Sequence, residues 1–86
     1  MSEYDTFPPY QKFKNVLSVC PEASLFYISL WKAKKPSGRV IINKKDLKTK
    51  FLTSKTLVRN YLLHLAKLDL VAWEEGIETF IIDLVV

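Results

Sequence analysis

The sequence predicts a small α+β domain with elements in the order helix, helix, strand, helix, helix, strand, strand. The chain has 86 residues, and 49% of them are hydrophobic, so it can build one folded domain around one modest core. Apolar residues recur with a helical period in several segments, whereas two apolar segments near the C-terminus flank a glycine, as in a β-hairpin. We therefore expect residues 1–8 to form an N-terminal arm and residues 9–86 to form a single domain.

Two helices are predicted first, over residues 9–19 and 21–35. Apolar side chains at i, i+3, i+4 and i+7 define one face of the first helix: Phe13, Val16, Leu17 and Cys20. Pro21 interrupts that helix, but proline is tolerated in the first turn of the next one. The second helix is apolar on more than one face, as a central core helix is, and Pro36 follows its end.

A short β-branched run predicts a strand over residues 39–42. Asn43 follows it and can cap a short amphipathic helix over residues 44–51. Leu52 is then the connector to the next helix.

The longest helix is predicted over residues 54–70, with Thr53 or Ser54 as its N-cap. Its apolar stripe keeps the helical period and comprises Leu57, Val58, Tyr61, Leu62, Leu65 and Leu68. Two short helices joined by a few residues, the second of them longer, match a helix-turn-helix layout.

A β-hairpin is predicted for residues 71–74 and 77–85, which flank Glu75 and Gly76. Glycine suits a tight turn because it has no Cβ. In the second strand one face is formed by Phe80, Ile82, Leu84 and Val86, and the other face also carries apolar side chains, Ile81 and Val85. A small domain buries one face of such a sheet, so we expect the other face to pack beneath the N-terminal arm or against a partner.

This element order resembles the winged helix-turn-helix superfamily over residues 21–84. The resemblance implies that residues 44–51 form the positioning helix, residues 54–70 the recognition helix and residues 71–84 the wing. It also implies that the strand at 39–42 joins the hairpin, which makes a three-stranded antiparallel sheet packed on a helical core. Members of this superfamily include small transcription regulators and replication initiators, so it implies a DNA-binding role.

The charges are strongly polarised along the chain. Residues 32–67 hold eleven of the thirteen Lys and Arg residues and one acidic residue, Asp46, which makes this segment formally +10 although the whole chain is +4. A concentrated basic segment is typical of a protein that meets a polyanion, and nucleic acid is the first candidate.

The predicted DNA contacts lie on the two helices of the helix-turn-helix, with residues 54–67 in the major groove. Arg59 and Asn60 are the expected base readers, because Arg and Asn side chains pair bidentately with guanine and adenine edges. Lysines of the shorter helix are expected to contact phosphates. The predicted DNA-binding residues are Lys44, Lys45, Lys48, Lys50, Ser54, Lys55, Thr56, Arg59, Asn60, His64 and Lys67.

The predicted wing departs from the superfamily, because its tip is acidic. Many members carry Arg or Lys there, whereas this tip contains Glu74, Glu75 and Glu78, which phosphates repel. Either the helices bind DNA alone, or the wing points away from the duplex. The alternative function is a winged-helix protein-interaction module whose acidic hairpin and basic helix face bind proteins. RNA binding through the same lysines is a third possibility.

Other function classes are disfavoured by composition. Cys20 and His64 are the single cysteine and the single histidine, so a disulfide within the chain and a four-ligand Cys/His zinc site are excluded. They lie in different elements and give no local support for a Cys–His nucleophile, so we expect no enzymatic activity, cofactor or small-molecule substrate. No apolar run approaches the roughly 20 residues of a membrane span, and the acidic N-terminus lacks the basic region of a signal peptide, so we expect a cytoplasmic protein.

A homodimer is the expected oligomer. Four aromatic side chains gather near the N-terminus: Tyr4, Phe7, Tyr10 and Phe13. So many rings in an arm indicate docking on the domain or on a second copy. Together with the two-faced C-terminal strand, they favour pairing through the N-terminal arm, the C-terminal strand, or both.

Overall fold

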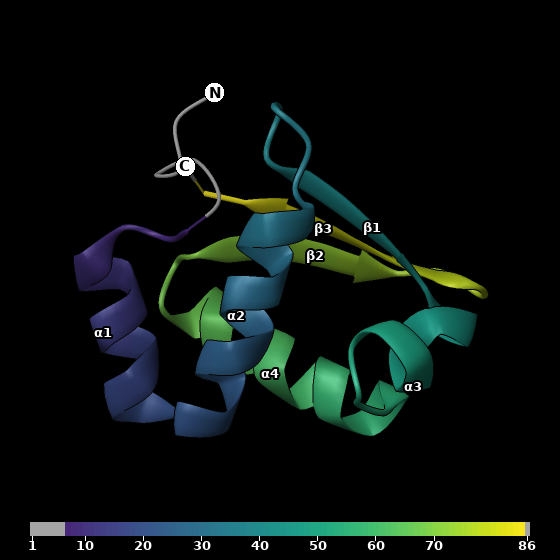
Figure 1. The fold of residues 1–86 in the computed structure, drawn as a ribbon, viewed down its shortest axis with the longest axis horizontal. Helices are drawn as coiled ribbons and strands as arrows, with labels where there is room; N and C mark the ends of the chain where they lie inside the picture. The colour runs from purple at the N-terminus through teal and green to yellow at the C-terminus, as the bar shows by residue number, and fades with distance from the viewer. Residues whose placement is uncertain (1–6, 86) are drawn as a thin grey trace.

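The computed structural model describes residues 7–85 and has an α+β architecture. The elements in order are α1 (Tyr10–Val19), α2 (Pro21–Ala33), β1 (Arg39–Asn43), the 3-10 turn η2 (Lys44–Asp46), α3 (Leu47–Lys50), α4 (Lys55–Lys67), β2 (Val71–Glu75) and β3 (Thr79–Leu84). The helices lie on one side of the sheet (Figure 1). The predicted α+β class and element order are confirmed. Within the described part of the chain, every helix is too short or too polar to cross a membrane.

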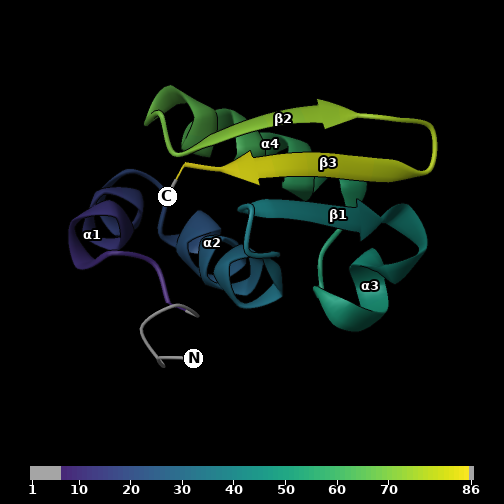
Figure 2. The same cartoon turned by 90° about the horizontal axis from the view of Figure 1, so that it is seen from above.

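The sheet has three antiparallel strands in the order β1-β3-β2, so the last strand of the chain is the central one (Figure 2). Ile82 of β3 lies opposite Val40 of β1 and Trp73 of β2. Side chains alternate across the sheet, so Ile82 and Phe80 are fully buried against the helices, whereas Ile41 on the other face is exposed. The third strand implied by the resemblance is therefore present.

The core lies between the sheet and the helices α2 and α4. Tyr27 and Leu30 of α2 are fully buried, and so are three residues of the α4 stripe, Val58, Leu62 and Leu65. Helix α2 packs against both α1 and α4, so its apolar surface extends round more than one face, as the sequence predicts.

Some core positions were predicted wrongly. Leu57 was assigned to the apolar stripe of the longest helix, yet 44% of its surface is exposed. Leu17 was assigned to the buried face of the first helix and is also exposed, whereas Val16 and Cys20 are buried. Both errors have one cause, since each leucine lies at the margin of its stripe and is left exposed by the elements of residues 7–85.

Helix ends follow local chemistry. The Asn43 side chain accepts a hydrogen bond from the N–H of Lys45, and the Ser54 side chain accepts one from the N–H of Leu57, so both N-caps are confirmed. The predicted helix over residues 44–51 is in fact a 3-10 turn followed by the four-residue α3.

The C-terminal ends of two helices come earlier than predicted. Helix α2 ends at Ala33, because Lys34 is already extended. Helix α4 ends at Lys67, because Asp69 adopts the left-handed region with φ 59°. The N–H of Leu70 then bonds the carbonyl of Leu65, and the N–H of Asp69 bonds that of Ala66, which is the hydrogen-bond pattern of a Schellman motif.

The hairpin is present, but its turn differs from the prediction. Ile77 and Glu78 form the tip, and the N–H of Gly76 bonds the carbonyl of Thr79 at 2.8 Å, so β3 begins at Thr79 and not at residue 77. A Cβ on Gly76 would meet Thr79 at an ordinary contact distance of 3.5 Å. The left-handed glycine is instead Gly38, with φ 88°, in the turn before β1.

The predicted N-terminal arm falls mostly outside residues 7–85, as do Tyr4 and Val86. At its described end, Pro8 is buried and Pro9 precedes α1. The ring centres of Phe7 and Phe13 lie 5.5 Å apart.

Candidate nucleic-acid interface

The outward face of α4 is the first part of the candidate interface. Thr56, Asn60, Leu63 and Lys67 are exposed on the side opposite the buried stripe. Because residues three and four apart share a helix face, these four side chains form one strip along the helix. His64 lies off this strip and is half-buried.

A basic hollow lies at the N-terminal end of the same helix, between η2, α3 and α4. We call it the lysine hollow. Its volume is about 190 Å³, and its lining consists of Lys44, Lys45, Leu47, Lys48, Thr53, Ser54 and Lys55. Lys45, Lys48 and Lys55 form no ion pair with any residue in 7–85. The hollow is therefore a concentration of uncompensated positive charge within the described part of the chain.

Backbone groups add to this preference for anions. The first N–H groups of a helix have no intrahelical partner, and the helix dipole places positive potential there. At the start of α4 the Ser54 side chain accepts a hydrogen bond from the N–H of Leu57 at 3.3 Å. The N–H groups of Lys55 and Thr56 are the other donors of the first turn. The hydroxyl of Thr53 is buried and has no hydrogen-bond partner among the described residues. The hollow can therefore offer donors as well as charge to an anion.

An acidic residue of the hairpin meets this basic surface directly. Glu75, at the end of β2, accepts hydrogen bonds from Arg59 Nε at 2.6 Å and Arg59 Nη2 at 2.7 Å. Lys44 Nζ donates to the same carboxylate at 2.6 Å and to the carbonyl of Gly76 at 2.8 Å. We call this arrangement of Glu75, Arg59 and Lys44 the hairpin clamp. It ties β2 to α4 and to η2.

The hairpin clamp changes the electrostatics of its members. Hydrogen bonds from Arg59 and then from Lys44 lower the pKa of Glu75 from 4.5 to about 2. The hydrogen bond to Glu75 likewise raises the pKa of Arg59. The carboxylate is therefore ionised at any physiological pH, and it compensates one of the two cations that it touches.

The structure brings some of the predicted DNA-binding residues together and separates others. Lys45, Lys48, Ser54 and Lys55 meet at the lysine hollow. Lys44 lines it too, but its ammonium is held at the hairpin, 5.2 Å from the ring centre of Phe80. Lys50 lies 3.5 Å from Asp46.

Glu75 is the residue of this site that the sequence did not assign to it. The sequence does carry a signal for this residue, because the acidic tip of the hairpin is unusual for the superfamily that the chain resembles. Its contact with Arg59 joins residues sixteen positions apart, however, and no local pattern predicts such a contact.

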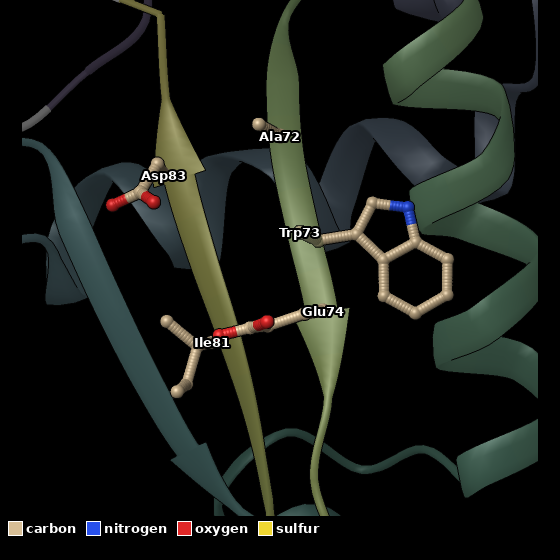
Figure 3. A pocket seen from close by; sticks show the side chains of 5 residues that line it. All are labelled: Ala72, Trp73, Glu74, Ile81 and Asp83. Atoms are coloured by element: carbon tan, nitrogen blue, oxygen red, sulfur yellow. The ribbon is translucent and has the colours of Figure 1, made fainter.

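The outer side of the hairpin has the opposite character. A shallow hollow of about 300 Å³ is lined by Ala72, Trp73, Glu74, Ile81 and Asp83 (Figure 3). Glu74 extends across the sheet over Ile81, whereas Trp73 points toward α4. Asp83 is paired with Arg39 at 2.9 Å. This surface is acidic and apolar, so it does not suit a nucleic acid.

Among the described residues, no hydrogen bond joins Cys20 to His64. Cys20 is buried at the junction of α1 and α2, where its thiol lies 3.8 Å from a carboxylate oxygen of Glu22. Within residues 7–85, no group of three or more His, Cys, Asp or Glu side chains could hold a metal ion.

Comparisons of the chain with protein-family models, with curated proteins and with solved structures found no match.

Proposed function

We propose that this protein is a sequence-specific double-stranded DNA-binding protein of winged helix-turn-helix type, such as a small transcription or replication regulator. The observation that carries the proposal is the lysine hollow beside the exposed strip of α4. A duplex presents a phosphate backbone beside base edges in the major groove, and this surface offers a cationic hollow beside an exposed helix. We propose a cytoplasmic, nucleoid-associated location to accompany this role.

The proposal divides the work between two sets of residues. Lys45, Lys48 and Lys55 contact phosphates and supply affinity that depends on salt but carries no sequence information. Asn60 and Arg59 read base edges, since their side chains pair bidentately with adenine and guanine.

The test is a fluorescence-anisotropy titration against random duplexes at low and near-physiological salt, with selection and sequencing of the bound duplexes. We expect the wild type to enrich a motif. Asn60→Ala should lose about 1–3 kcal/mol of discrimination at one base pair. Lys48→Ala should instead weaken binding to every sequence and reduce the salt slope by about one.

Lys14→Ala is the matched control, because Lys14 is an exposed lysine of α1, at the far end of the molecule from α3 (Figure 1). Lys14→Ala removes the same charge as Lys48→Ala. It should leave the selected motif unchanged and should change the salt dependence of binding very little. Absence of duplex binding even at low salt would contradict the proposal. Equal behaviour of Asn60→Ala and Lys48→Ala on all duplexes would contradict sequence-specific reading.

A second candidate function, a protein-interaction module, is favoured by the hairpin tip. Ile77 is 96% exposed there, beside the outward carboxylates Glu74 and Glu78. An exposed apolar side chain between carboxylates suits a basic protein surface, including the lysine hollow of a second copy. Salt-sensitive self-association without duplex affinity is the result that would favour this candidate.

We also propose that the protein acts as a homodimer. On the outer sheet face Ile41 is half exposed, and Val85 beyond β3 is nearly as exposed. A dimer should enrich a palindrome with half-sites about one helical turn apart. Sedimentation equilibrium at micromolar concentration checks the mass directly, and a monomer there would contradict the dimer.

A further inference from the structure

We infer that Glu75 is a positioning residue for base reading: from the hairpin, it holds the guanidinium of Arg59 so that the opposite edge of that group faces a guanine in the major groove. This inference rests on the proposed DNA binding and deepens it. It also gives the acidic wing a role that does not require the wing itself to touch phosphate.

The geometry of the hairpin clamp leaves one edge of Arg59 available. A guanidinium carries five N–H groups, and Glu75 takes one from Nε and one from Nη2, at 2.6 and 2.7 Å. One hydrogen of Nη1 and one of Nη2 remain side by side, and together they form an edge that can pair bidentately with guanine O6 and N7. The Arg59 side chain is 44% exposed, so the side chain is open to a ligand in part.

The carboxylate is itself held in place, which is what a positioning role requires. Lys44 Nζ bonds Glu75 and the carbonyl of Gly76, and the backbone N–H of Lys44 donates to the carbonyl of Glu78 at 2.8 Å. Only 25% of the Glu75 side chain is exposed. A long, flexible arginine side chain is thereby restricted to one arrangement before any duplex binds, which lowers the entropy lost on binding.

The charges allow a competing explanation that makes a different prediction. If Glu75 merely masked Arg59 and Lys44 from phosphate, its neutralisation would raise affinity for every duplex by the same factor. If Glu75 orients Arg59, its neutralisation raises non-specific affinity but lowers the preference for guanine at one position. The ratio of specific to non-specific binding therefore separates the two roles.

The experiment compares wild type, Glu75→Gln and Glu78→Gln by selection from random duplexes and by titration at low salt. Glu78→Gln is the matched control, because it removes the same charge from the same hairpin and the Glu78 side chain makes no hydrogen bond with residues 7–85. We expect Glu75→Gln to lower the guanine preference about 5- to 100-fold while non-specific binding stays equal or rises. Glu78→Gln should keep the guanine preference. Arg59→Lys keeps the charge but loses the fork, so it should lose the preference as Glu75→Gln does.

A spectroscopic measurement on the free protein accompanies the selection and remains informative if Glu75→Gln folds poorly. The Arg59 Nε–H signal of the wild type should exchange slowly with water, and rapid exchange would overturn the inference. An unchanged guanine preference in Glu75→Gln would overturn it and leave the DNA-binding proposal standing. A uniform rise on all duplexes would assign masking to Glu75 instead. A wild type that selects no motif would remove the proposed function, and this inference with it.

Discussion

Leu52 combines two unfavourable properties in the turn between α3 and α4. Its φ is 51°, in the left-handed region, and 86% of its surface is exposed. The left-handed conformation costs a residue with a Cβ about 1–2 kcal/mol, and almost no burial offsets that cost here. The turn between α3 and α4 thus holds local strain.

Replacing this leucine should therefore stabilise the protein. Leu52→Gly removes the strain but frees the unfolded backbone, which costs about 0.5–1 kcal/mol, so we expect a net gain of about 0.5–1 kcal/mol. Urea unfolding followed by circular dichroism measures it. Leu63→Gly is the matched control, since Leu63 is exposed within α4, and it should lose about 1 kcal/mol. Destabilisation by Leu52→Gly would show that the leucine side chain makes a stabilising contact.

Residues that act on their own neighbours were predictable from the sequence. Asn43 and Ser54 bond N–H groups two and three positions ahead, and such caps depend on residue type and spacing alone. Leu52 and Asp69 were not identified as left-handed, because neither residue favours that region strongly enough to be recognised.

At the scale of elements, the hairpin clamp is a polar contact that links the hairpin to α4 and η2. Glu75 lies on β2, Arg59 on α4 and Lys44 on η2, so one carboxylate joins three elements. Ordering long side chains such as those of Arg59 and Lys44 costs entropy. The bidentate geometry of the Glu75–Arg59 pair and the second cation, Lys44, offset this cost.

The hairpin clamp should make stability sensitive to acid. The pKa of Glu75 is about 2 in the folded protein and 4.5 ordinarily, so its contribution is complete above pH 4.5 and is lost as the pH falls toward 2. Hydrogen bonds from Arg39 also lower the pKa of Asp83, so the wild type carries a second acid-sensitive group. The quantity to measure is the difference in melting temperature between wild type and Glu75→Gln from pH 7 to pH 2.

This difference should be constant above pH 4.5 and shrink below it. Glu78→Gln provides the reference for loss of a hairpin charge without loss of the hairpin clamp. If the melting temperatures of wild type and Glu75→Gln differ by the same amount at pH 7 and at pH 2, then Glu75 does not bond Arg59 and Lys44 in solution.

Element boundaries were predicted where a stop signal is local. Pro21 and Pro36 mark the limits of α2 to within a few residues. The exposure of Leu57 was not predictable, because helical period identifies the centre of an apolar stripe, whereas its width depends on which elements pack beside it.

At the scale of the whole molecule, β3 organises the fold. It pairs with both other strands, and Phe80 at its start is fully buried, with its ring centre 6.3 Å from that of Trp73. The strand β3 thus joins the other two strands of the sheet, and its buried side chains face the helical layer (Figure 2).

Removing that side chain should threaten the entire fold. Phe80→Ala should cost about 3–5 kcal/mol, out of the roughly 5–15 kcal/mol typical of a domain. Urea unfolding measures the loss, and Ile77→Ala is the comparison because Ile77 lies on the same hairpin but is 96% exposed. Ile77→Ala should change stability by less than about 0.5 kcal/mol. Equal effects of the two substitutions would contradict the central place of β3.

By itself, the sequence determined the α+β class, the order of the elements, the helix caps and the basic character of residues 32–67, because each follows from spacing and residue type along the chain. Only the tertiary structure decided that Glu75 meets Arg59 and Lys44, that three lysines meet beside Ser54, and that Leu57 stays exposed. These features depend on how β2, η2, α3 and α4 pack against one another. Their positions therefore depend on the packing of whole elements and not on any pattern within one of them.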